Sequence, residues 1–126
     1  MSGSPKPRIL MVEDEALLLE VITADLEDFG FTVVQATTAE SAMAILEAET
    51  AIDILFTDIR LPGQMDGWQL AEAARRLRPG LPVIYATGFS QTPPRLIEGS
   101  VFFAKPYRAV SLIKAIASFE VGPDAA

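Results

Sequence analysis

The chain has 126 residues, 50% of them hydrophobic, and a formal net charge of −7 at pH 7. This length suits one domain with its own core, and the acidic balance argues against nucleic acid or an anionic membrane surface as the main partner. Cysteine and histidine are both absent, which excludes disulfides, thiolate nucleophiles, Ser-His-Asp catalysis and metal sites built from histidine or cysteine.

The two ends of the chain are predicted to lie outside the folded domain. Residues 1–7 lack the apolar centre of a signal peptide and are predicted to be a disordered lead-in. Residues 8–120 form the predicted domain, and residues 121–126 a short tail. Because no apolar run approaches the roughly 18 residues that cross a bilayer, we expect a cytoplasmic protein.

Short apolar runs alternate with helical patterns along the domain. Such runs are typical of parallel strands covered by helices on both faces. Strands are predicted over residues 8–12, 31–36, 52–57, 82–86 and 101–104. The alternation predicts an α/β, flavodoxin-like fold, with a doubly wound five-stranded parallel sheet in a single domain.

The helices are predicted from apolar stripes and from the residues at their ends. Gly30 closes the first helix, Thr37 and Glu40 resemble a capping box with Thr37 as N-cap and Glu40 at N3, and Asp66 caps the third helix. The segment 91–99 has room for about two turns of helix, and Pro94 fits only the first turn. The residues predicted to face inward are Leu18, Ile22, Leu26, Phe29, Ala42, Ile45, Leu46, Leu70, Ala74, Leu77, Val110, Ile113 and Ile116.

Charged and hydroxyl side chains follow four of the five predicted strands. In a parallel sheet the carboxyl ends of the strands share one edge, where ligands bind. Carboxylates crowded together repel one another, and Mg²⁺, which takes oxygen ligands at about 2.1 Å, relieves that repulsion. The residues concerned are Glu13 and Asp14 after the first strand, Asp58 after the third, Thr87 after the fourth and Lys105 after the fifth.

This set of side chains suits phosphoryl transfer, which needs positioning and charge neutralisation more than a proton shuttle. Asp58 is the predicted nucleophile and forms an aspartyl phosphate. Each residue alone has a simpler explanation: Asp58 starts a turn, residues 13–15 favour a helix N-terminus, Thr87 lies in a turn, and Lys105 is a solvated strand end. Their joint occurrence at four strand ends favours a functional site.

The ordered set resembles the receiver domain of two-component response regulators. The resemblance covers nearly the whole chain, from Arg8 to Phe119, and implies that residues 8–120 are a receiver domain. It is carried by the acidic pair Glu13-Asp14, Asp58 in D-I-R-L-P-G-Q-M-D-G, Thr87 after Ala86, and Lys105-Pro106.

The resemblance implies a role for each of these residues. Asp14 would bind Mg²⁺ directly, Glu13 would bind it through water, and Asp58 and the backbone carbonyl of Arg60 would complete the protein ligands, with Mn²⁺ as an alternative metal. Thr87 would hydrogen-bond the phosphoryl group and move toward it.

Three further positions belong to the same implied machinery. Phe102 matches the family's switch aromatic, although core packing also explains it. Gly88 and Phe89, together with Arg60, would flank the phosphoryl site.

The chain departs from the commonest receiver pattern in two places. The loop from Asp58 to Asp66 is one residue longer, with Gly63 or Gln64 as the extra residue. The segment 85–90 resembles a subfamily marked by Phe-Ala-Thr-Gly followed by an apolar and an aromatic residue, except that the chain has tyrosine at the first position and serine at the last. The short segment 90–99 is hypothesised to become ordered on phosphorylation or partner binding.

The resemblance implies a phosphoprotein of a two-component phosphorelay rather than a classical enzyme. A partner histidine kinase or histidine phosphotransferase would donate to Asp58, with Mg²⁺-dependent self-phosphorylation and autodephosphorylation as the only activities. No effector domain follows residue 120, so we expect signal transduction through protein–protein contact or phosphate relay; a receiver excised from a hybrid histidine kinase or larger regulator fits equally. The rivals are a haloacid-dehalogenase-type phosphatase, which needs an aspartate where the chain has Arg60, and a degenerate receiver that binds partners without phosphorylation.

Overall fold

Five parallel strands form the central sheet of the computed structural model, which describes residues 7–48, 51–88 and 99–120. The strand order across the sheet is β2-β1-β3-β4-β5. The predicted doubly wound, five-stranded parallel sheet is therefore confirmed. The strands are β1 (Arg8–Val12), β2 (Thr32–Ala36), β3 (Ile54–Asp58), β4 (Val83–Thr87) and β5 (Val101–Ala104), and the helices are α1 (Ala16–Asp28), α2 (Ala39–Glu47), α3 (Gly67–Leu77) and α4 (Ala109–Glu120).

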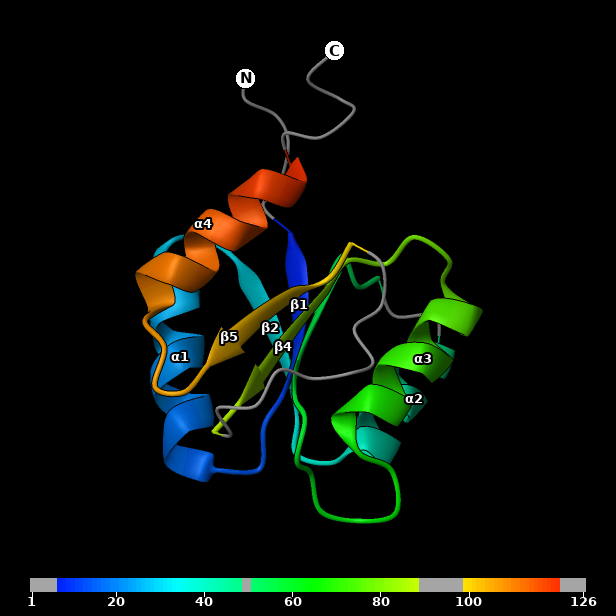
Figure 1. Cartoon of the computed structure of the whole chain (residues 1–126). Coiled ribbons are helices and arrows are strands. Elements are labelled where there is room, and N and C mark those ends of the chain that lie inside the picture. The colour runs from blue at the N-terminus through cyan, green and yellow to red at the C-terminus, as the bar shows by residue number, and fades with distance from the viewer. Residues whose placement is uncertain (1–6, 49–50, 89–98, 121–126) are drawn as a thin grey trace.

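Helices cover both faces of the sheet, with α1 and α4 on one face and α2 and α3 on the other (Figure 1). Because successive side chains of a strand point to opposite faces, each inner strand contributes to two cores. Leu10 and Leu55 pack under α2 and α3, whereas Ile9 and Phe56 pack under α1 and α4. Burial on both faces explains why these strands are continuous apolar runs.

Three residues predicted to face inward are instead exposed at the helix surfaces: Phe29 at 54%, Leu77 at 45% and Val110 at 49%. Phe29 follows the last residue of α1 as its C-cap, so its side chain leaves the helical stripe. In α4 the buried pair is Leu112 and Ile116, one turn apart, because that side of the helix faces the sheet. The predicted stripes of α1, α2 and α3 are otherwise buried or half-buried, and only in α4 is the buried face rotated from the predicted one.

The N-cap of α2 lies one residue later than predicted. Thr38, not Thr37, has the extended backbone of an N-cap, and its hydroxyl accepts a hydrogen bond from the Ser41 backbone N–H at 3.0 Å. Ser41 therefore occupies N3, and its Oγ lies 3.3 Å from the Thr38 nitrogen. The prediction of Thr37 and Glu40 as a capping box was wrong, since Glu40 falls one position short of N3.

The other predicted helix ends are confirmed. Asp66 caps α3 in a reciprocal capping box with Gln69, with both hydrogen bonds at 2.9 Å. Gly30 follows α1 with φ +96°, a conformation that favours glycine.

Some predictions fall on parts of the chain that the structure does not describe. Phe89 and the segment 90–99, apart from Gly99, lie outside the described residues, so the predicted short helix and the hypothesis that this segment becomes ordered are not tested. Within the described ranges, none of the helices combines the length and apolar character needed to cross a membrane.

Candidate functional site

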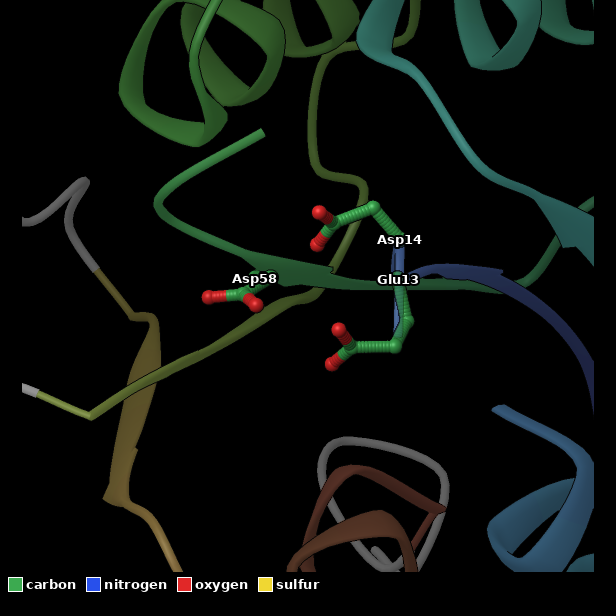
Figure 2. A group of neighbouring side chains, drawn as sticks. All are labelled: Glu13, Asp14 and Asp58. Carbon is green, nitrogen blue, oxygen red and sulfur yellow. The ribbon is translucent and has the colours of Figure 1, made fainter. Parts of the chain in front are cut away.

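The carboxyl ends of the strands bring the predicted site residues to one edge of the sheet. The strand register places Val12 opposite Thr57, Asp58 opposite Ala86 and Thr87 opposite Ala104, so Asp58 and the residues after β1, β4 and β5 all leave the sheet at the same edge. One carboxylate oxygen each from Glu13, Asp14 and Asp58 lies within 4.8 Å of the other two. Figure 2 shows the three carboxylates pointing to the same side of this edge.

Lys105 supplies the positive charge of the cluster. Its ammonium Nζ lies 2.8 Å from Asp58 Oδ2, 3.1 Å from Glu13 Oε1 and 3.2 Å from Glu15 Oε1. Its backbone N–H donates to the Thr87 carbonyl at 2.8 Å, which fixes the start of the loop after β5. Burial by itself lowers the pKa of Lys105, but hydrogen bonds to Asp58 and Glu13 and their negative charges outweigh burial and raise it. The ammonium is therefore charged throughout the physiological range.

Glu13 is the buried acid of the cluster. It is 2% exposed, and its Oε2 accepts a hydrogen bond from the Glu15 backbone N–H at 3.0 Å. Burial raises the pKa of Glu13 from 4.5 to about 6, and the charge of Asp58 adds to the rise, while the hydrogen bonds from Glu15 and Lys105 oppose it. The site thus holds a carboxylate whose charged form is costly, which favours a compensating cation.

Asp58 ends β3 and is only 6% exposed. The start of α3 passes close to the backbone of Asp58 and Ile59, and there the Gly67 N–H donates to the Ile59 carbonyl at 2.8 Å. A Cβ atom at Gly67 would lie 2.2 Å from the Asp58 carbonyl oxygen and 2.7 Å from Ile59 Cα. Only glycine at this position allows α3 to begin so close to the site.

Asp14 and Arg60 lie on the open side of the cluster. Both are exposed, and together with Asp66 and Trp68 they line a depression beside Asp58. Trp68 packs on Tyr85 with a ring-centroid distance of 4.7 Å, so the wall of this depression continues into the core.

The predicted switch residues lie on β4 and β5. Thr87 is the last residue of β4 and is 3% exposed, while Gly88 after it is exposed. Phe102 is half-buried and packs against the core under α2 and α3, paired in register with Tyr85. Phe102 therefore does not belong to the charged cluster itself.

Tyr107 is a neighbour of the site that sequence reasoning missed. Its ring packs edge-on against Phe56 at 5.5 Å, and its buried hydroxyl has no hydrogen-bond partner among the described residues. Burial raises the pKa of Tyr107, and the negative charge of Glu13 raises it further. The only sequence signal is an aromatic residue two positions after Lys105, and many core residues fit that description.

The donor set fits a hard divalent cation. Three carboxylates at one strand edge offer oxygen ligands, and the absence of histidine and cysteine from the sequence excludes imidazole and thiolate ligands. Mg²⁺ and Mn²⁺ prefer such oxygen ligands. The residues that could hold the ion are Glu13, Asp14 and Asp58.

Comparisons with known proteins agree on one family. A family model described as "Response regulator receiver domain" matches residues 9–117. The C4-dicarboxylate transport transcriptional regulatory protein DctD of Rhizobium meliloti is 36% identical over 115 residues, which are 88% of this chain and 25% of DctD. The response regulator protein FleR of Pseudomonas aeruginosa is 31% identical over 120 residues, which are 91% of this chain and 25% of FleR. The chain thus spans about a quarter of the length of these relatives.

Solved structures show the same likeness over nearly the whole chain. A response regulator receiver protein from Sinorhizobium medicae has a TM-score of 0.87 and 32% identity, with 93% of this chain and 96% of that chain covered. The receiver domain of the hybrid histidine kinase CckA has a TM-score of 0.77 and 31% identity, with 88% and 96% covered.

Proposed function

The chain belongs to the response regulator receiver family, whose domains are phosphoacceptors in two-component signalling, and on that premise we propose that Asp58 is the residue that accepts the phosphoryl group. The observation that carries this assignment is the 2.8 Å contact between Asp58 Oδ2 and Lys105 Nζ inside a cluster of acids. A carboxylate at a strand end, held by a fixed ammonium, is positioned for in-line attack on phosphorus.

The proposed step forms one bond and breaks one. A carboxylate oxygen of Asp58 bonds to phosphorus as the bond from phosphorus to the donor breaks, and the donor leaves with the bonding electrons. With a phosphohistidine donor, the leaving group is an imidazole nitrogen. Lys105 neutralises charge on the phosphoryl oxygens, and the Thr87 hydroxyl hydrogen-bonds one of them after transfer.

Receiver domains bind Mg²⁺ through acidic residues, and we assign the ligands of this chain accordingly. Asp14 and Asp58 would bind the ion directly, Glu13 through water, and Arg60 through its backbone carbonyl, with Mn²⁺ as an alternative metal. The ion would neutralise charge on the transferred group. Support comes from the shared oxygen cluster of Glu13, Asp14 and Asp58.

Phosphorylation is proposed to bias a two-state equilibrium through Thr87 and Phe102. Thr87 lies at the end of β4, and Phe102 lies on the neighbouring strand β5. In this proposal, movement of the Thr87 side chain toward the phosphoryl group changes the packing of the Phe102 ring. A coupling of this kind is typically about 1–3 kcal/mol. Arg60 and Gly88 flank the phosphoryl group in this proposal.

The proposal extends to the setting of the domain. Residues 8–120 are taken as the receiver domain, working in the cytoplasm, with a histidine kinase or histidine phosphotransferase as donor. Turnover is limited to self-phosphorylation and autodephosphorylation. A phosphatase of the haloacid dehalogenase type is disfavoured, because Arg60 stands where that chemistry needs a second aspartate.

Incubation with acetyl phosphate and Mg²⁺, followed by intact-mass measurement, tests the assignment. The wild type should gain one phosphoryl group and Asp58→Asn none. Asp53→Asn is the matched control, because Asp53 is exposed and lies just before the opposite end of the same strand. Its Oδ2 accepts a hydrogen bond from the Arg8 backbone N–H, and the amide oxygen of asparagine can take the place of that atom.

Each contrary result has a distinct meaning. A phosphoryl group on Asp58→Asn would place the acceptor elsewhere, and no gain by the wild type would favour the degenerate receiver. Steady hydrolysis of a free phosphoester would favour the phosphatase.

A further inference from the structure

We propose that Glu40, in the first turn of α2, is a positioning residue for the cation site, because its carboxylate holds the loop of residues 60–65 that follows Asp58. Glu40 touches neither Asp58 nor the acidic cluster in the contacts described, so it acts through the loop. The inference rests on the proposed function, in which the Arg60 carbonyl at the start of this loop binds the metal.

The contact joins elements that are distant in sequence. The Gln64 backbone N–H donates to Glu40 Oε2 at 3.1 Å, across 24 positions. Gly63 has φ +96°, and a Cβ atom on it would lie 2.8 Å from Glu40 Oε1. The carboxylate therefore fills the space beside Gly63 and binds the next residue at the same time.

Glu40 is free to make this contact because it does not cap its own helix. The capping box of α2 uses Thr38 and Ser41, whose side chains accept hydrogen bonds from each other's backbone N–H groups. An acid in the first turn is also favoured by the helix dipole, and that effect alone would explain a glutamate at this position. It does not explain why the side chain turns to a loop 24 residues away.

The loop is anchored at both ends and held in the middle by Glu40. At one end the Ile59 N–H donates to the Ala86 carbonyl at 3.0 Å, and at the other the Gly67 N–H donates to the Ile59 carbonyl at 2.8 Å. Residues 62–64 between them are exposed. A longer exposed loop has more conformations available, and this loop is one residue longer than the commonest receiver pattern. A hydrogen bond at its centre restricts those conformations.

The position of this loop matters for a cation because Arg60 is its first residue. Arg60 and Asp14 line the same depression beside Asp58, so a displaced loop would carry the Arg60 carbonyl away from the carboxylates. Mg²⁺ demands near-ideal octahedral geometry, and residues that orient its ligands therefore affect affinity without touching it.

The test is Mg²⁺ binding by the wild type, Glu40→Ala and Glu40→Gln, measured by titration calorimetry and by the fluorescence of Trp68. Trp68 is the sole tryptophan and lines the depression with Arg60. Glu40→Ala should weaken Mg²⁺ binding about tenfold, the lower end for residues that orient metal ligands. Glu40→Gln keeps an acceptor oxygen for the Gln64 N–H and should stay within about twofold.

Glu47→Ala is the matched control, since Glu47 is an exposed acid on the same helix and its removal changes the net charge equally. It should bind Mg²⁺ within about twofold of the wild type. Exchange of the Gln64 amide proton gives a second readout, and it should be faster in Glu40→Ala than in Glu40→Gln.

The outcomes separate this inference from the proposed function. Unchanged binding by Glu40→Ala, or equal losses in Glu40→Ala and Glu47→Ala, would overturn the role of Glu40 and leave the phosphoacceptor proposal standing. A loss in Glu40→Gln as large as in Glu40→Ala would show that charge acts instead of the hydrogen bond, and would overturn it too. Absence of Mg²⁺ binding by the wild type would instead count against the proposed cation site.

Discussion

Replacing Glu13 by glutamine should stabilise the metal-free protein at neutral pH. Glu13 is 2% exposed. Burial raises its pKa from 4.5 to about 6, even though the hydrogen bond and positive charge of Lys105 lower it. At about 1.4 kcal/mol per pH unit, this rise corresponds to about 2 kcal/mol of unfolding free energy. Glutamine has nearly the same shape and carries no charge, so it should recover most of that free energy.

The sign of the pH dependence follows from the direction of the pKa change. The folded state binds the Glu13 proton more tightly than the unfolded state does. Protonation of Glu13 therefore contributes fully to the free energy of unfolding below pH 4.5, and this contribution is lost as the pH rises through 6. The gain from Glu13→Gln should therefore be about 2 kcal/mol near pH 7.5 and close to zero near pH 4.5.

Urea unfolding followed by Trp68 fluorescence, with a chelator present, measures this difference. Glu15→Gln is the control, because Glu15 contacts the same Lys105 at 3.2 Å but is 64% exposed. It should change stability by less than about 0.5 kcal/mol at either pH. Equal stability of Glu13→Gln and wild type near neutral pH, or a gain that persists in acid, would refute burial of the charge as the cause.

Three further substitutions test other parts of the site by the same unfolding assay. Lys105→Met leaves the Asp58 cluster without its cation and should cost about 3 kcal/mol with a chelator present, part of it regained with Mg²⁺; a loss below about 1 kcal/mol would contradict the ion-pair geometry. Gly67→Ala forces a Cβ atom to 2.2 Å from the Asp58 carbonyl oxygen and should cost more than about 3 kcal/mol, whereas Gly88→Ala, which meets nothing within 4 Å, should cost less than about 1 kcal/mol; equal costs would argue against the close approach. Tyr107→Phe removes a buried hydroxyl without a described partner and keeps the ring, so stability should stay equal or rise by about 1 kcal/mol, and a clear loss would reveal a partner for that hydroxyl.

Much of the site was predictable from local sequence because parallel strands share an edge. Apolar runs located β1, β3 and β5, and the polar residues directly after them had to emerge at that edge. The 2.8 Å contact between Lys105 and Asp58 joins residues 47 positions apart, and the parallel direction of the strands already places both residues at the same edge. The resemblance to receiver domains rests on the same ordered residues, and the family model covers the same span.

Helix surfaces were less predictable, because an apolar stripe defines a face only to within part of a turn. Val110 fits its stripe but is exposed, because the buried side of α4 is decided by how the helix lies on the sheet, and Phe29 is exposed because α1 ends one residue before it. The sequence predicted Thr37 as the N-cap of α2, and only the backbone conformation of the structure places the cap one residue later, at Thr38.

By itself, the sequence of this protein determined the strands, their alternation with helices and the acids, threonine and lysine at the strand ends, because these depend on short-range periodicity. The tertiary structure alone decided three contacts: the hydrogen bond from Gln64 to Glu40, the ion pair of Glu15 with Lys105, and the edge-on packing of the Tyr107 ring against Phe56. Those contacts depend on the separation and rotation of packed elements. Neither quantity is set by any local pattern of residues, since both result from how all the side chains of the core fill space together.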